Sequence, residues 1–403
     1  PAALLPGDRP GNFSQRGRSG CPLATVRGPG HTGHHRFFRR DQSGKKTSGL
    51  VFNSGILSGP IIISKGRLLM LKVIADQPSI KKYAREFVRK LRPFVDEQVK
   101  VKLGHQGAST PAKVSWSKKL GIWTFAHVAK EIRYWNAFGI GKPKTGALLP
   151  ITSEINFPWS GIDRKTGAAF AQDAWGSVFV IHRGKIGGGK KGVGKSFFEH
   201  NYRGVWSLME DGNCITQVAV IGILNSPRLA WQTANFVKKI EMLKSAATVN
   251  SSQTEIDFPD VTFRLDLVGC LPEVAEPDIG AQCDHDFVVN TLAAHLRRWK
   301  LKPGNDGSHE LFLLEPSKSR KSHIFEILTD AQGKNVLAAA AKLLLQAKND
   351  PDNPLPVLIL PEEKMLAHAQ LLPQINVNVA GFRLEDDRVI FHDLDKIRLD
   401  QKP

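Results

Sequence analysis

The chain has 403 residues and a formal charge of +18, from 56 Lys and Arg against 38 Asp and Glu. This length allows two or three domains, each with its own core. The excess of positive charge favours a polyanionic partner, most often nucleic acid, over a merely solvated basic surface. No apolar run approaches the roughly 20 residues that a membrane-spanning helix needs, which argues against a membrane protein.

The four cysteines are widely scattered and form no C-x-x-C pair: Cys21, Cys214, Cys270 and Cys283. This spacing argues against a structural zinc site and against a disulfide framework. A reducing, cytoplasmic location fits it best.

Residues 1–69 are rich in Gly, Arg, His, Pro and Ser and hold only two acidic residues, Asp8 and Asp41. Because such a segment cannot bury enough apolar surface to offset its ordering entropy, it is predicted to be a disordered basic leader. The first methionine is Met70, so one hypothesis is that the natural product starts there and residues 1–69 are upstream sequence read in frame. The alternatives are a basic disordered arm and an Arg-rich transit peptide.

Residues 70–119 are predicted to be a helix followed by a linker. Apolar side chains recur at helical spacing in this segment, at Ile80, Tyr83, Phe87 and Leu91. The stretch 104–119 is rich in Gly, Ser, Thr and Pro, which is typical of a loop.

Residues 120–247 are predicted to be an α+β domain that binds nucleic acid. Phe125 to Phe138 has a helical period, whereas "SVFVIHRGKI" (177–186) has the β-branched and aromatic residues of a strand. Residues 204–224 indicate a β-hairpin that turns near Asp211 and Gly212. A helix is expected to follow, capped by Ser226.

The stretch "GGGKKGVGKS" (187–196) matches the P-loop pattern G-x-x-x-x-G-K-[ST] from Gly189 to Ser196. A nucleotide-binding loop also needs a helix directly after it and a Mg²⁺-binding Asp on a later strand. Here Asn201 and Gly204 interrupt the following helix pattern, and the best later strand ends in Asn225. We therefore interpret the loop as one that approaches a nucleic-acid phosphate, with a flexible turn as the alternative.

The loop and its flanks supply positive charge and backbone amides. The residues expected to contact the phosphate backbone are Arg183, Lys185, Gly188, Gly189, Lys190, Lys191, Lys195 and Arg203. Such contacts provide affinity and register but no sequence specificity. The nearby aromatic residues Phe197, Phe198, Tyr202 and Trp206 are expected either to stack on bases or to belong to the core.

The polar stretch 248–260 is predicted to be the main domain boundary, and residues 255–403 an α/β domain. The expected elements are a helix in "CDHDFVVNTLAAHLRRWKLKP", strands in "HELFLLE" and "SHIFEILTD", a helix in "NVLAAAAKLLLQAK", a buried parallel strand in "LPVLILP", a helix in "EEKMLAHAQLL" and two strands in "INVNVAGFRLEDDRVIFHD". An Asp of "CDHD" is expected to cap its helix. Leu337, Leu344 and Leu345 are expected to be core.

This element order, with its sequence, resembles the core of the PD-(D/E)xK superfamily, the restriction-endonuclease-like nucleases. In that family one acid lies on a strand, and a second acid lies with a Lys in D/E-x-K on the next strand. Because alternate residues of a strand face the same side, that acid and Lys point into one cleft. Glu326 matches the D/E position, and Glu310 stands where the first acid is expected, with Asp306 as a second candidate.

The sequence departs from the family at position 328, where Leu328 replaces the lysine. In some superfamily members a catalytic side chain comes from the following helix, and Lys342 could supply it. The alternative for Lys342 is an ordinary solvated lysine. The domain would then be an inactive copy that only binds.

The resemblance implies a mixed sheet flanked by helices and a Mg²⁺ or Mn²⁺ ion held by Glu310, Glu326 and Asp306, with Lys342 completing the catalytic set. We expect a metal-dependent endonuclease of restriction or defence type that acts on double-stranded DNA, and a homodimer as an inference from the resemblance. One alternative is a non-catalytic nucleic-acid-binding or assembly subunit. The other is a P-loop nucleotide hydrolase.

Overall fold

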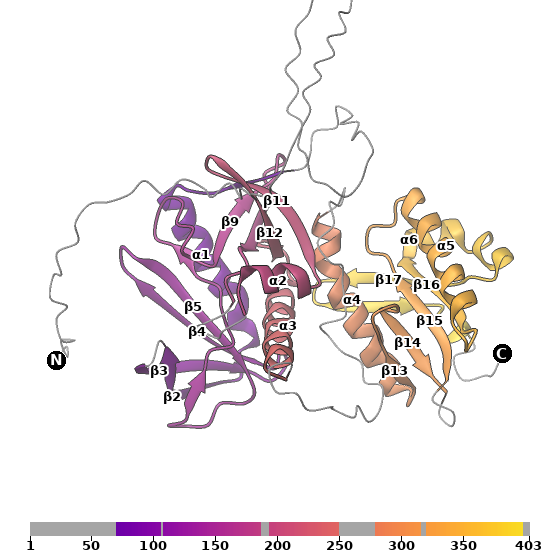
Figure 1. Cartoon of the computed structure of the whole chain (residues 1–403), viewed down its shortest axis with the longest axis horizontal. Coiled ribbons are helices and arrows are strands. Elements are labelled where there is room, and N and C mark those ends of the chain that lie inside the picture. Colours follow the sequence, from indigo (N-terminus) through magenta and orange to yellow (C-terminus); the bar gives the residue numbers. More distant parts are fainter. Residues whose placement is uncertain (1–69, 106–107, 187–192, 250–278, 316–319, 398–403) are drawn as a thin grey trace, which may run out of the picture. The chain divides into compact units, whose positions relative to one another are not determined.

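The computed structural model describes residues 70–105, 108–186, 193–249, 279–315 and 320–397. They form a mixed α/β structure with six α-helices and three sheets (Figure 1). Three groups of predictions lie outside the described residues: the leader 1–69, the loop residues Gly188, Gly189, Lys190 and Lys191, and the boundary segment from residue 250 on.

The predicted N-terminal helix is confirmed as α1 (Gln77–Leu91), which follows the short strand β1 (Leu71–Val73). Asp76 caps α1, because its side chain accepts a hydrogen bond from the backbone N–H of Ser79 at 2.9 Å. Its apolar face is buried through Ile80, Ala84, Phe87 and Leu91.

The linker predicted over 104–119 is wrong, because this segment belongs to a seven-stranded sheet. Its strands are β2 (Glu97–His105), β3 (Ala108–Ser117), β4 (Ile122–Ala129), β5 (Arg133–Ile140), β6 (Leu148–Pro150), β7 (Ser153–Glu154) and β8 (Phe157–Pro158). The strand pattern is the alternation of buried Val99, Val101 and Leu103 with exposed lysines. Pairing of β3 with β4 also crosses the boundary expected between residues 119 and 120.

The helix predicted over Phe125–Phe138 is also wrong, because the segment is the β4–β5 hairpin. Trp123 stands opposite Gly139 in this pair, and a Cβ on Gly139 would lie 2.4 Å from the indole. The glycine therefore makes room for a fully buried tryptophan, and this packing of strand on strand overrides the helical spacing of the apolar residues.

A closed five-stranded barrel follows, in the order β1-β11-β12-β10-β9. Its strands besides β1 are β9 (Ala168–Gln172), β10 (Val178–His182), β11 (Val205–Asp211) and β12 (Cys214–Ile223). The predicted strand and the predicted hairpin are both confirmed, and Gly212 makes the turn with a φ of +72°. Cys283 is free and buried.

Two helices accompany the barrel, α2 (Lys195–Asn201) and α3 (Leu229–Val249). A helix does follow the glycine loop, but it has only seven residues. The longer α3 lies in the main apolar core, where Leu229, Phe236 and Ile240 are buried together with residues of α1 and of both sheets.

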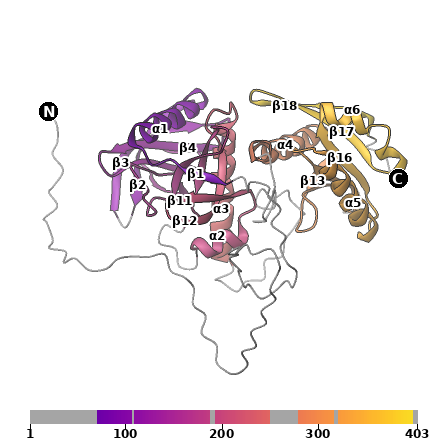
Figure 2. The ribbon, with the colours of Figure 1, turned by 90° about the horizontal axis from the view of Figure 1, so that it is seen from above.

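Residues 279–397 follow the predicted order closely. The elements are α4 (Ile279–Arg298), β13 (Lys302–Gly304), β14 (Leu311–Leu314), β15 (Lys321–Ile327), α5 (Gly333–Asn349), β16 (Leu355–Pro361), α6 (Glu362–His368), β17 (Asn378–Glu385) and β18 (Arg388–His392). The sheet runs in sequence order, with β15, β16 and β17 parallel and the other neighbours antiparallel. One face packs on α4 and the other on α5, as Figure 2 shows from above.

Two details of this region differ from expectation. Leu337 and Leu345 are exposed rather than core, because α5 turns Val336, Ala339, Ala340, Leu343 and Ala347 inward. No Asp of "CDHD" caps α4, since the helix begins at Ile279 and these residues lie inside it. Within the described ranges, no helix is both long and apolar enough to cross a membrane.

Candidate active site

Glu310 and Glu326 lie at the same end of the β14–β15 pair. Leu311 stands opposite Phe325 in the antiparallel register, so the preceding Glu310 and the following Glu326 face each other across the pair. Two carboxylates from neighbouring strands are thereby brought together, as the sequence predicted.

Lys342 reaches this site from α5. Its Nζ donates hydrogen bonds to both carboxylate oxygens of Glu326, at 2.7 and 2.8 Å. The Lys342 side chain is still 52% exposed, whereas that of Glu326 is 15% exposed. Leu328, at the position of the family's lysine, packs against the core under α5. The positive charge beside Glu326 therefore comes from the helix and not from the strand.

His285 approaches from α4, on the other face of the sheet, with Nε2 2.6 Å from Oε1 of Glu310. Sequence reasoning missed this residue, because "CDHD" was considered only as the source of an Asp that caps the helix. The helical period of the sequence places His285 on α4. No local pattern, however, indicates that its side chain contacts Glu310, which lies 25 residues later in the chain.

The four groups influence one another electrostatically. Burial raises the pKa of Glu326, Lys342 lowers it, and the Glu310 charge raises it again, with a raised pKa as the result. Burial lowers the pKa of His285, but the charge and hydrogen bond of Glu310, and the charges of Asp286 and Glu326, more than reverse this. The site thus holds two carboxylates, an imidazole and an ammonium close enough to interact.

These residues suit a divalent cation only in part. In the part of the chain that the structure describes, no group of three or more His, Cys, Asp or Glu residues could hold a metal ion. Mg²⁺, however, is commonly bound by one or two carboxylates plus water and substrate phosphates. Glu310 and Glu326 meet that smaller requirement, and both are oxygen donors.

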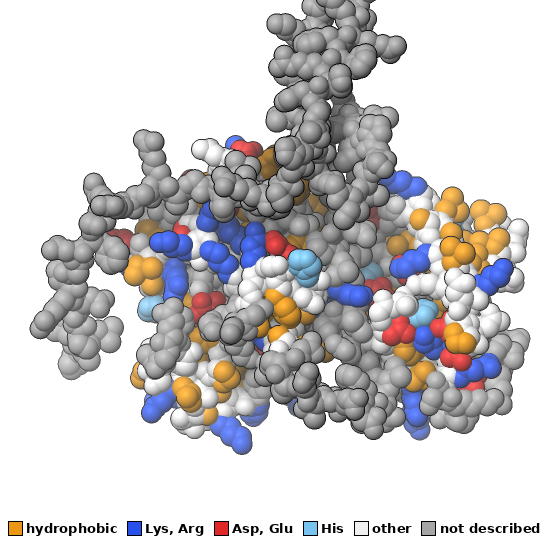
Figure 3. Space-filling model, viewed as in Figure 1, with side chains coloured by type: hydrophobic (Ala, Val, Ile, Leu, Met, Phe, Trp, Pro, Cys, Tyr) orange, Lys and Arg blue, Asp and Glu red, His pale blue; other side chains and the backbone are white. Residues whose placement is uncertain are grey.

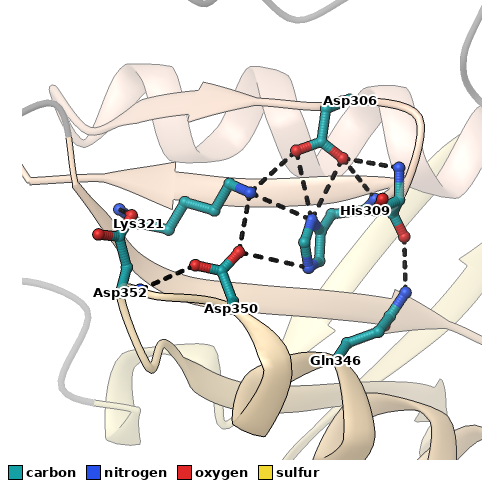
Figure 4. Close-up of polar contacts among 7 residues, drawn as sticks. Asp306, His309, Lys321, Gln346, Asp350 and Asp352 are labelled. Atoms are coloured by element: carbon teal, nitrogen blue, oxygen red, sulfur yellow. Dashed lines mark hydrogen bonds and ion pairs between the residues drawn. The ribbon is translucent and has the colours of Figure 1, made fainter.

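Asp306, the third predicted ligand, belongs to a separate polar cluster (Figure 4). Its carboxylate accepts hydrogen bonds from the backbone N–H groups of Ser308 and His309, at 2.8 and 2.7 Å, and lies 2.9 Å from Lys321 Nζ. Burial raises its pKa, but these hydrogen bonds outweigh burial and hold the pKa at about 2. Lys321 also bonds Asp350 at 2.9 Å, so the cluster joins the β13–β14 loop to β15 and to the end of α5. We therefore leave Asp306 out of the ligand set.

Arg183, predicted to contact phosphate, is instead a buried structural residue. Its guanidinium donates to both carboxylate oxygens of Asp211, at 2.9 and 3.0 Å, and to the carbonyl of Ala168 at 3.2 Å. The Arg183 side chain is only 6% exposed. The prediction is wrong because the carboxylate of Asp211, the last residue of β11, holds the guanidinium of Arg183, which follows β10, in a buried ion pair.

The other described cations of the loop region have partners within the protein. Lys185 donates to the carbonyl of Arg164, Lys195 forms an ion pair with Glu199 at 3.4 Å, and Arg203 is partly exposed. Contact of these three residues with nucleic acid stays a prediction. The aromatic residues Phe198, Tyr202 and Trp206 are core: they are buried and packed on one another, with the Phe198 and Tyr202 rings stacked at 4.6 Å.

No protein-family model, no curated protein and no solved structure matches this chain. The geometry around Glu310, Glu326, Lys342 and His285 is therefore the basis on which a function has to be argued.

Proposed function

We propose that the protein binds nucleic acid and hydrolyses phosphodiester bonds at the site of Glu310, Glu326 and Lys342, as an endonuclease of restriction or defence type. The contact between Lys342 and Glu326 is the observation that carries this proposal. It supports the idea that α5 supplies the charge that Leu328 cannot supply. The order α4, three antiparallel strands, α5 and a parallel strand supports the restriction-endonuclease-like fold.

Glu310 and Glu326 would hold a Mg²⁺ or Mn²⁺ ion. A bound cation of this kind polarises a phosphate and lowers the pKa of an attacking water. His285 would position Glu310, because a ring N–H donated to Oε1 restricts how the carboxylate can turn.

Lys342 would act on the substrate. The ammonium group of Lys342 has three N–H donors. It donates to both carboxylate oxygens of Glu326. Because the side chain remains half-exposed, its Nζ can also donate to a non-bridging phosphate oxygen and stabilise the charge that develops there.

A plasmid-nicking assay with Mg²⁺ or Mn²⁺ tests the proposal. We expect Glu326→Gln and Lys342→Met each to lower the cleavage rate by about 100-fold or more, as the loss of one charged group in a transition-state site does. Lys348→Met removes another exposed lysine of α5 and should cleave like wild type. A wild-type protein without metal-dependent cleavage, or a fully active Lys342→Met, would contradict the proposal.

A non-catalytic nucleic-acid-binding or assembly subunit is the second candidate. This candidate is favoured by Leu328, which stands where the family motif has its lysine and packs against the core instead of carrying a charge. DNA binding by the wild type with no cleavage under either metal would support this candidate. The nucleotide-hydrolase alternative gains no support from the described residues, because α2 is short and Lys195 is paired with Glu199.

A further inference from the structure

Helix α1 carries an unbalanced set of charges. Between Gln77 and Phe94 the chain has six basic residues, Lys81, Lys82, Arg85, Arg89, Lys90 and Arg92, and a single acid, Glu86. All of the basic residues except Lys90 are exposed. In Figure 3, Lys and Arg side chains gather over the region where Figure 1 shows α1 and the strands beside it.

The exposed cations lie opposite the buried face of the helix. Ile80, Ala84, Phe87 and Leu91 point into the core. At 3.6 residues per turn, the five exposed basic positions fall on an arc of about 100° on the far side. Lys81 to Arg92 spans about 16 Å along the axis at 1.5 Å per residue. We call Lys81, Lys82, Arg85 and Arg89 of α1, together with Arg92 directly after its last residue, the cationic face of α1.

This arrangement costs the free protein stability. Lys81 with Arg85, and Arg85 with Arg89, are like-charged neighbours at a spacing of four residues, and each such pair destabilises a helix by about 0.2–0.5 kcal/mol. Among the described residues, the ion pair that offsets this repulsion is that of Arg89 with Glu86, at 3.3 Å. No acidic side chain of the described residues forms an ion pair with Lys81, Lys82 or Arg85.

Lys90 shows the ordinary structural use of such a residue. Its Nζ donates to the carbonyl of Asn225 at 2.9 Å and lies 3.4 Å from that of Ser226. It therefore joins α1 to the segment before α3. Within the described ranges, the ion-pair and ring contacts of the cationic face stay inside α1: Arg89 pairs with Glu86, and Lys82 lies 5.6 Å from the centre of the Tyr83 ring. These contacts do not join α1 to another element, and the side chains remain exposed to an external anion.

Building on the proposed function, we propose that the cationic face of α1 binds the phosphate backbone of the double-stranded DNA presented to the site at Glu326. Duplex DNA carries one phosphate of each strand for about every 3.4 Å of helix axis, so a row of cations about 16 Å long can lie beside several phosphates. An anionic membrane fits less well. A helix that lies on a membrane inserts its apolar face, and that face of α1 is buried in the core.

The test compares two triple variants of the full chain that lose the same formal charge. The first is Lys81→Gln, Arg85→Gln and Arg89→Gln. The control is Lys130→Gln, Lys142→Gln and Lys396→Gln, which removes exposed lysines that already face an acid, at 3.8, 2.8 and 2.7 Å. The probe is a labelled 20-base-pair duplex of mixed sequence, titrated at several salt concentrations, with phosphatidylserine vesicles as a second arm.

We expect the α1 variant to bind the duplex about tenfold or more weakly than wild type at 0.1 M salt. The slope of log affinity against log salt should become shallower by about 2 to 3, since each phosphate contact contributes about 0.9. Its thermal midpoint should stay the same or rise, because two repulsive pairs are removed. The control should keep most of the wild-type slope.

Equal slopes for the α1 variant and wild type, no binding of the duplex by wild type, or binding to the vesicles in place of DNA would each overturn the assignment of α1. The nicking assay tests the catalytic proposal, and its result does not depend on the outcome of the binding experiment. A protein that binds DNA through α1 but never cleaves it contradicts only the catalytic proposal. A protein that cleaves with Lys81, Arg85 and Arg89 removed contradicts only the role of α1.

Discussion

His182 shows how neighbours set the chemistry of one buried side chain. It lies at the end of β10 and is fully buried beside Phe198 and Phe236. The backbone N–H of Gly184 donates to its Nδ1 at 3.1 Å, which leaves the ring proton on Nε2, 3.3 Å from the carbonyl oxygen of Glu154. Burial, opposed by the Glu154 hydrogen bond and assisted by the charges of Arg183 and Lys244, lowers the pKa of His182 to about 4.

This pKa predicts a loss of stability in weak acid. The folded pKa is below the unfolded value of about 6.5, so the unfolded chain binds the proton more tightly. The contribution, up to about 3 kcal/mol, is present above pH 6.5 and is lost as the pH falls toward 4. His182→Gln should flatten the pH dependence of the unfolding free energy in this window, measured by urea titration. The exposed His127→Gln should leave it unchanged, and an equal effect of the two variants would contradict the argument.

At the scale of elements, α5 was predicted correctly as a helix, but two of the residues predicted to be buried on it are exposed. The helix was predicted from its composition, yet the leucines expected in the core, Leu337 and Leu345, are 63% and 64% exposed. Leu343 is fully buried, in line with Val336 and Ala340. The alanine-rich sequence offers apolar residues all around the helix, so only the sheet beneath it selects the inner face. That choice also turns Lys342 toward Glu326.

The same substitution at three positions of α5 tests this register. Leu343→Ala should lower the free energy of unfolding by about 2–5 kcal/mol, because it removes buried methyl groups and leaves a cavity. Leu337→Ala and Leu345→Ala should each change it by no more than about 0.5 kcal/mol. Urea unfolding of the three proteins measures these differences. Similar losses at all three positions would show that another face of α5 is buried.

At the scale of the whole molecule, ion pairs connect side chains far apart in the sequence. Arg228, just before α3, donates to both carboxylate oxygens of Asp284 in α4, at 2.7 and 2.6 Å. The two side chains are only 16% and 9% exposed. Lys239 of α3 pairs with Asp286, and Lys119 with Asp387. The residues of "CDHD" therefore serve α3–α4 packing and the site at Glu310, rather than a helix cap.

A double-mutant cycle measures the strongest of these connections. Asp284→Ala should destabilise the protein by about 3 kcal/mol, because it leaves the Arg228 guanidinium partly buried without its anion. The double variant with Arg228→Ala should be less destabilised than the sum of the single variants, by about 1–3 kcal/mol.

The exposed pair of Lys142 and Glu97 serves as the control for this cycle. Its coupling should stay below about 1 kcal/mol, because solvent screens the interaction. Additive effects at Arg228 and Asp284 would refute the structural role of the pair.

The sequence by itself determined the excess of positive charge on the chain and nearly every element of residues 279–397. These elements could be predicted because they carry local patterns, such as the wholly apolar "LPVLILP" of β16. The family resemblance also assigned Glu310 and Glu326 to one site, and the antiparallel register of β14 with β15 places them opposite each other.

Only the tertiary structure decided the rest. β3, β4 and β5 are strands because neighbouring strands accept their backbone groups, although their spacing suggested a loop and a helix. Arg183 is buried because Asp211 lies within reach, and His285 serves the site because α4 packs over the strand that follows Glu310. Each outcome depends on a partner distant in the sequence, and local patterns carry no information about which distant groups will share a hydrogen bond or a core.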